Sequence, residues 1–163
     1  MTQKAGRPSA SEDCHLETLE EEATHVTDEC RMILPGVQAI LGFQLIAVFN
    51  ERFGRFSEAE QLLHLAAFLL VMSAMGLIMA PAALHRQAER GRVTRRFVNL
   101  ASTLLTLAMV PFMLGVSFDT YLVALLVSAQ TNTSLLVAVG TLIVLGGLWF
   151  GLPAYCRSRN QPR

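Results

Sequence analysis

The sequence predicts an all-α integral membrane protein: a bundle of four transmembrane helices, preceded by a short cytoplasmic amphipathic helix. Of the 163 residues, 52% are hydrophobic, and four stretches contain no Asp, Glu, Lys or Arg: residues 32–49, 62–84, 97–118 and 135–155. About 20 apolar residues in a helix cross the ~30 Å hydrocarbon core of a bilayer. The basic residues are also unevenly distributed between the stretches, as is typical of multi-pass membrane proteins.

The chain before the membrane domain, which we place at residues 32–156, divides into two parts. Residues 1–12 form a polar tail with nothing to bury, so we expect disorder there. Residues 13–31 repeat apolar side chains at helical spacing and carry acidic residues near the start, which predicts an acidic amphipathic helix. This helix is either a collar packed under the bundle or a docking surface for a partner.

The positions of the basic residues predict the orientation. Placing both termini in the cytoplasm, including the tail 157–163, leaves two basic residues outside and 11 inside. We therefore expect both termini to be cytoplasmic. The loop 86–96 then lies against the inner leaflet, where anionic lipid headgroups would contact four arginines: Arg90, Arg92, Arg95 and Arg96.

Polar residues inside the predicted helices are the candidates for function. Gln38 and Gln44 lie in the first helix, where each amide needs a partner, either as packing contacts or along an ion path. The third helix places polar side chains on one face, suited to packing or to lining a pore: Asn99, Ser102, Thr103 and Thr106. Residues 119–134 are an external extension of that helix, an interfacial helix or a re-entrant segment.

Two histidines mark the ends of the second predicted helix. His64 and His85 are separated by 21 residues, or about 31 Å of helix, so they cannot share a metal ion or a proton. Each is either a hydrogen-bonded anchor at the interface or a pH sensor, because histidine changes charge near neutral pH.

One cluster is expected at the inner interface, where the first two helices form a hairpin. Glu29, Arg31, His85 and Arg86 should lie at the same depth. The cluster is an ion-pair clamp, or the entrance to an ion path that continues past Gln38, Gln44, Asn99, Ser102 and Thr106.

Glycines give the fourth helix a smooth surface. Gly140, Gly147 and Gly151 fall within about 40° of one another and should accept a second helix at close range. That helix belongs to the same bundle or to another subunit, and we expect a homo-oligomer.

Residues 16–156 resemble an uncharacterised bacterial family of small four-helix inner-membrane proteins, defined as a domain of unknown function and sometimes labelled sodium:proton antiporter. Five segments show the resemblance: Glu29-Cys30-Arg31, Leu34-Pro35-Gly36-Val37-Gln38, Gly42-Phe43-Gln44, Arg52-Phe53 and Ala80-Pro81-Ala82-Ala83-Leu84-His85-Arg86. The resemblance implies the membrane fold and no mechanism.

The sequence excludes several functions. It contains no complete catalytic constellation, metal site or cofactor motif, so we expect no enzyme, and its net charge of zero gives no bias toward nucleic acid. The four charge-free segments hold no carboxylate, which argues against sodium:proton antiport. We expect an oligomeric ion or proton channel or transporter; the alternative is a non-conducting scaffold or regulatory subunit that docks lipids or partner proteins.

Overall fold

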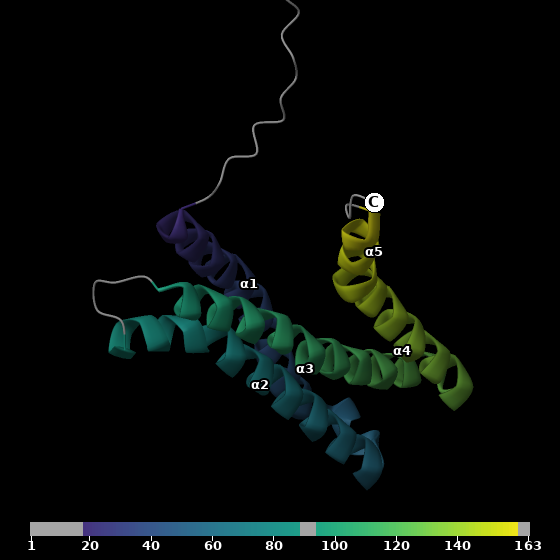
Figure 1. Ribbon diagram of the computed structural model, residues 1–163. Coiled ribbons are helices and arrows are strands. Elements are labelled where there is room, and N and C mark those ends of the chain that lie inside the picture. The colour runs from purple at the N-terminus through teal and green to yellow at the C-terminus, as the bar shows by residue number, and fades with distance from the viewer. Residues whose placement is uncertain (1–17, 89–93, 160–163) are drawn as a thin grey trace, which may run out of the picture.

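The structure is entirely helical in the residues that it describes. A computed structural model describes residues 18–88 and 94–159, in which no strand occurs. The elements are α1 (Leu19–Val48), a 3₁₀ turn η1 (Glu51–Arg55), α2 (Glu58–Ala88), α3 (Arg95–Ser128), α4 (Thr131–Gly146), a π-helical turn η2 (Gly147–Gly151) and α5 (Leu152–Arg159) (Figure 1). Within these described ranges, four helices are long and apolar enough to cross a membrane: Glu21–Val48, Glu58–Leu84, Arg95–Ser128 and Thr131–Arg159.

The first helix begins before the predicted membrane segment. Thr18 caps α1, because its hydroxyl accepts from the Glu21 N–H at 3.4 Å while the Glu21 carboxylate accepts from the Thr18 N–H at 2.8 Å. From there α1 continues without a break to Val48, through Pro35. Helix α1 therefore contains both the described part of the predicted amphipathic segment 13–31 and the predicted membrane segment 32–49 up to Val48.

Helices α1, α2 and α3 pack against one another. Their shared core contains five buried residues: Val37, Leu41, Val71, Ile78 and Ala108. Helices α2 and α3 approach closely at Gly115, where an added Cβ would lie 2.7 Å from Val71 Cγ2 and 2.9 Å from the Ala67 carbonyl oxygen. Since a Cβ does not fit there, the α2–α3 contact requires glycine.

The fourth helix is attached differently. Helix α4 packs along α3, and in Figure 1 it diverges from α1 and α2. Its buried residues are Ser134 and Ala138, near its start. A closed four-helix bundle therefore stays a prediction.

Helix α3 continues through the segment that the sequence left open. It has 34 residues, about 51 Å at the usual helical rise, and it ends at Ser128. Ala129 then adopts a left-handed conformation with φ of 52°, and α4 begins at Thr131. Residues 119–128 thus extend the third helix, and Asp119 lies within it.

Ser134 stabilises the turn between α3 and α4. Its hydroxyl is buried, donates to the Gln130 carbonyl at 2.8 Å and lies 3.3 Å from the Ser128 hydroxyl.

We expect S134A to lower the free energy of unfolding by about 1 kcal/mol, because it removes these hydrogen bonds. The control is S73A, which removes an exposed hydroxyl bonded to the Leu69 carbonyl at 2.7 Å and should change it by less than about 0.5 kcal/mol. Thermal unfolding in detergent compares the two variants. Equal losses of stability would contradict the role of Ser134 in the turn.

Candidate functional site

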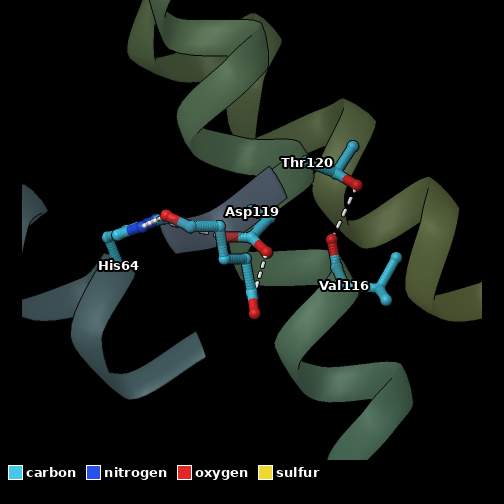
Figure 2. Close-up of polar contacts among 5 residues, drawn as sticks. His64, Val116, Asp119 and Thr120 are labelled. Carbon is cyan, nitrogen blue, oxygen red and sulfur yellow. Dashed lines mark hydrogen bonds and ion pairs between the residues drawn. The ribbon is translucent and has the colours of Figure 1, made fainter. Parts of the chain in front are cut away.

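Three polar side chains from three helices meet at the end of the molecule where η1 joins α1 to α2. Gln44 of α1 donates from Nε2 to Asp119 Oδ2 of α3. The His64 ring of α2 lies between two acceptors. Its Nδ1 is 3.3 Å from Asp119 Oδ1, and its Nε2 is 3.0 Å from the backbone carbonyl oxygen of Gln44. Figure 2 shows His64 reaching from its helix toward Asp119. We call these three residues the polar cluster.

The polar cluster is buried within apolar helices. Gln44 is 4% exposed and His64 8%, and the side chain of Asp119 is 22% exposed. All three lie inside helices long and apolar enough to span a membrane, about 6 to 14 Å along the helix axis from the nearest helix end. Ionisable side chains at such positions are costly unless they are paired, and they commonly mark routes for ions or protons.

The hydrogen-bond geometry fixes how many protons the cluster holds. The backbone carbonyl oxygen of Gln44 can only accept, so its contact with His64 Nε2 is a hydrogen bond only when Nε2 carries a hydrogen. The contact between His64 Nδ1 and Asp119 Oδ1 needs one further proton, on the imidazole or on the carboxyl group. In both arrangements the pair has no net charge, and one proton is shared between the two side chains.

The polar cluster lines a cavity of about 430 Å³. Asn50 and Arg52 add polar groups, and the other lining side chains are apolar: Ile40, Phe43, Ala47, Phe53, Phe56, Leu122, Val123 and Leu126. The Phe53 ring packs edge-on against the His64 ring, with 5.3 Å between their centroids. Within the described residues, Gln44 Oε1 is a buried side-chain atom without a hydrogen-bond partner.

The other polar positions predicted in the membrane lie elsewhere. Gln38 is exposed on α1, away from the polar cluster. Asn99, Ser102 and Thr106 are exposed on the first half of α3, and Thr106 donates to the Ser102 carbonyl at 2.9 Å. Ser102 and Thr106 line a separate cavity of about 350 Å³. The structure thus brings Gln44 alone, of the five predicted residues, into the cluster.

The residues predicted at the inner interface are only partly described. Arg31 pairs with Asp28 at 3.3 Å, on the exposed surface of α1, and Glu29 is exposed beside them. The side chains of His85 and Arg86 lie outside the described part of the chain. The clamp between these two helices therefore stays a prediction.

The predicted lipid and packing positions are exposed where they are described. Arg90 and Arg92 lie outside the described residues, and Arg95 and Arg96 are exposed at the start of α3. Nothing lies within 4 Å of a Cβ built on the three predicted packing glycines: Gly140, Gly147 and Gly151. Within this chain, the close helix contact occurs at Gly115 instead.

Asp119 is the functional residue that sequence reasoning missed. The predicted third segment stopped at Phe118 because the next residue is charged, so the membrane was expected to contain no carboxylate. The structure continues α3 past this boundary, so Asp119 lies within a long apolar helix and contacts two other helices. The available signal was a single carboxylate with an apolar helical stretch on both sides.

Four described helices are long and apolar enough to cross a membrane, and three of them meet at the polar cluster, which indicates a multi-pass α-helical membrane protein. No group of three or more His, Cys, Asp or Glu side chains in residues 18–88 and 94–159 could hold a metal ion. The model of a family of unknown function, DUF6328, matches residues 12–153, and the chain belongs to this family. This confirms the resemblance to an uncharacterised family. No curated protein and no solved structure matches the chain.

Proposed function

We propose that this protein is a proton-coupled membrane transporter and that the His64–Asp119 pair is its proton-binding site. One observation supports this above all: a histidine nitrogen and a carboxylate oxygen lie 3.3 Å apart inside apolar helices, at the wall of a cavity. Proton relays in pumps and transporters are built from such intramembrane Asp, Glu and His groups. The buried carboxylate also removes the sequence-based objection to proton exchange.

The packing beside the polar cluster supports a carrier over an open channel. Along α2, one turn and two turns beyond His64, Ala67 and Val71 are fully buried, and both contact the Gly115 position of α3. Val37 of α1 is also buried in this core. Since these side chains fill the interior of the three helices, a proton passes only when the helices change their packing.

Reconstitution tests the proposed function. The full-length protein is placed in liposomes that enclose a pH-sensitive dye, and a pH gradient is imposed with Na⁺, K⁺ or a small alkylammonium ion on the opposite side. We expect the gradient to collapse several times faster than in protein-free liposomes with at least one of these ions. A rate equal to that of protein-free liposomes with all three would contradict the proposal.

We also propose that both termini are cytoplasmic, which places the polar cluster near the outer surface of a bacterial inner membrane. The distribution of basic residues supports this orientation. Cys156 is exposed on α5 and provides a test. In intact cells, a maleimide that cannot cross the inner membrane should leave Cys156 unlabelled and should label it after lysis; labelling before lysis would reverse the orientation.

A second candidate is a scaffold or regulatory subunit without transport or enzymatic activity. The exposed apolar surface of α4 supports it, since Leu136, Ile143 and Val144 are uncovered beside the open glycine positions. A homo-oligomer formed on this surface, with Arg95 and Arg96 at anionic headgroups, suits either function. Native mass spectrometry from nanodiscs tests assembly, and a monomer at all concentrations would exclude it.

A further inference from the structure

We propose that the cavity beside the polar cluster binds an apolar organic ammonium ion, which enters as the shared proton of the cluster leaves. This inference rests on the proposed function, because it names the second substrate of the same site. It follows from three observations: the size of the cavity, the unpartnered side-chain oxygen of Gln44, a residue that lines it, and the charge balance of the His64–Asp119 pair.

The size of the cavity fits a small organic molecule better than a metal ion. Its volume of about 430 Å³ is far larger than a bare metal ion and lies within the ~300–1,000 Å³ typical of small-molecule sites. Most of its lining is apolar, with three phenylalanine rings: Phe43, Phe53 and Phe56. A ligand that fills this space therefore buries an apolar body against aromatic and aliphatic side chains.

The polar atoms in the wall select a hydrogen-bond donor with positive charge. Gln44 Oε1 is buried, lacks a partner among the described residues and can only accept. The neighbouring Asp119 carboxylate is a second acceptor in the same wall. An ammonium group offers three donors and a positive charge, so its chemistry suits both acceptors. The aromatic rings favour the same charge, since a cation is attracted to their faces.

Charge balance links ammonium binding to proton release. Before binding, one proton between His64 Nδ1 and Asp119 Oδ1, which lie 3.3 Å apart, leaves the pair without net charge. If an ammonium ion pairs with the Asp119 carboxylate, a protonated His64 would face a second cation at short range in a buried site. The proton therefore leaves the pair as the ammonium ion enters, and the site stays neutral in both states. One cation is exchanged for one proton.

Arg52 is the charged side chain of η1 that lines the same cavity. It is exposed, and the carboxylate of Glu51, next to it in the chain, is exposed as well, so solvent screens its effect on an entering cation. Taken alone, Arg52 would favour an organic anion. An anionic ligand is therefore the competing outcome that the experiment must separate.

Three probes of nearly equal shape make that separation in the detergent-purified full chain. Isothermal titration calorimetry compares 2-phenylethylammonium, 2-phenylethanol and 3-phenylpropanoate at about pH 7, where an alkylammonium keeps its charge. We expect the ammonium ion to bind at least about tenfold more tightly than the alcohol, and the carboxylate to bind more weakly than both. Titration in two buffers of different ionisation enthalpy should show release of close to one proton per ammonium ion.

Variants assign the binding to the cavity. D119N should weaken ammonium binding by about 10- to 100-fold, because it removes the charged acceptor. The matched control D28N removes an exposed carboxylate on α1 and should bind as the wild type does. H64Q should lower the number of protons released to less than half. The probe series and the proton count use the wild type, so they test the proposal even if a variant does not fold.

Several results would overturn the inference: tighter binding of the carboxylate than of the ammonium ion, ammonium binding without proton release, or equal weakening in D119N and D28N. The two proposals also fail separately. If no ammonium ion binds while proton movement in liposomes still depends on Asp119, the ligand is wrong and the proposed function stands. If the ammonium ion binds with proton release but the protein moves no protons in liposomes, the proposed function fails and the binding site stands.

Discussion

The D119N variant should move protons no faster than protein-free liposomes. An asparagine keeps the size of the side chain and can still hydrogen-bond to Gln44 and His64, but its amide cannot take up and release a proton at physiological pH. Because Asp119 shares the one exchangeable proton of the polar cluster with His64, the route is interrupted at that point. The measurement is the collapse of an imposed pH gradient in liposomes at matched protein content.

The control for this loss is D28N. Asp28 is an exposed carboxylate in an ion pair with Arg31 on α1, far along the chain from the cluster, so its replacement should leave the rate unchanged. Circular dichroism of both variants establishes that the helices are intact. Proton movement at the wild-type rate in a folded D119N would show that the cluster is not on the route.

The G115V variant should lose about 3 kcal/mol in free energy of unfolding. Its new Cβ would lie 2.9 Å from the Ala67 carbonyl oxygen, and backbone cannot yield as a flexible side chain does. Overpacking of a filled core typically costs about 1–3 kcal/mol, and the clash with backbone places this site at the upper end. Separation of α2 from α3 would also disturb the polar cluster, since His64 and Asp119 lie on those two helices.

Gly76 provides the matched comparison, because it lies in α2 and nothing is within 4 Å of its Cβ position. We expect G76V to change the free energy of unfolding by less than about 1 kcal/mol. Thermal unfolding in detergent, followed by circular dichroism, compares the two. If both variants lose the same stability, the effect comes from valine within a helix and not from the α2–α3 contact.

The four helices were predictable because hydrophobicity is a local property of the chain. The predicted second segment, 62–84, lies wholly within α2, and the charge-free run from residue 97 lies within α3. The end of α3 was not predictable in the same way. A charged residue was taken as the membrane boundary, whereas Asp119 is accommodated by partners on α1 and α2 that are more than 50 positions away in the chain.

The polar cluster shows the same limit for individual side chains. Gln38 and Gln44 both interrupt the apolar run of the first helix, and their residue type gives no reason to prefer one. Only the packing of α1 buries Gln44 against Asp119 and leaves Gln38 exposed. The same limit applies to the glycines. The spacing of three glycines suggested close packing on the fourth helix, whereas within the described chain the isolated Gly115 of α3 lies in close contact with α2.

The protonation of the His64 ring tests the central claim most directly. Nitrogen NMR of ¹⁵N-histidine-labelled protein, with the His64 signals assigned by their loss in H64Q, reports which ring nitrogens carry hydrogen. Because the Gln44 backbone carbonyl oxygen can only accept, Nε2 should carry a hydrogen, and Nδ1 should give the signal of a nitrogen that shares a hydrogen with a carboxyl group. An Nδ1 signal typical of a bare imidazole nitrogen without a hydrogen bond, or an unprotonated Nε2, would contradict the shared proton and the transport mechanism built on it.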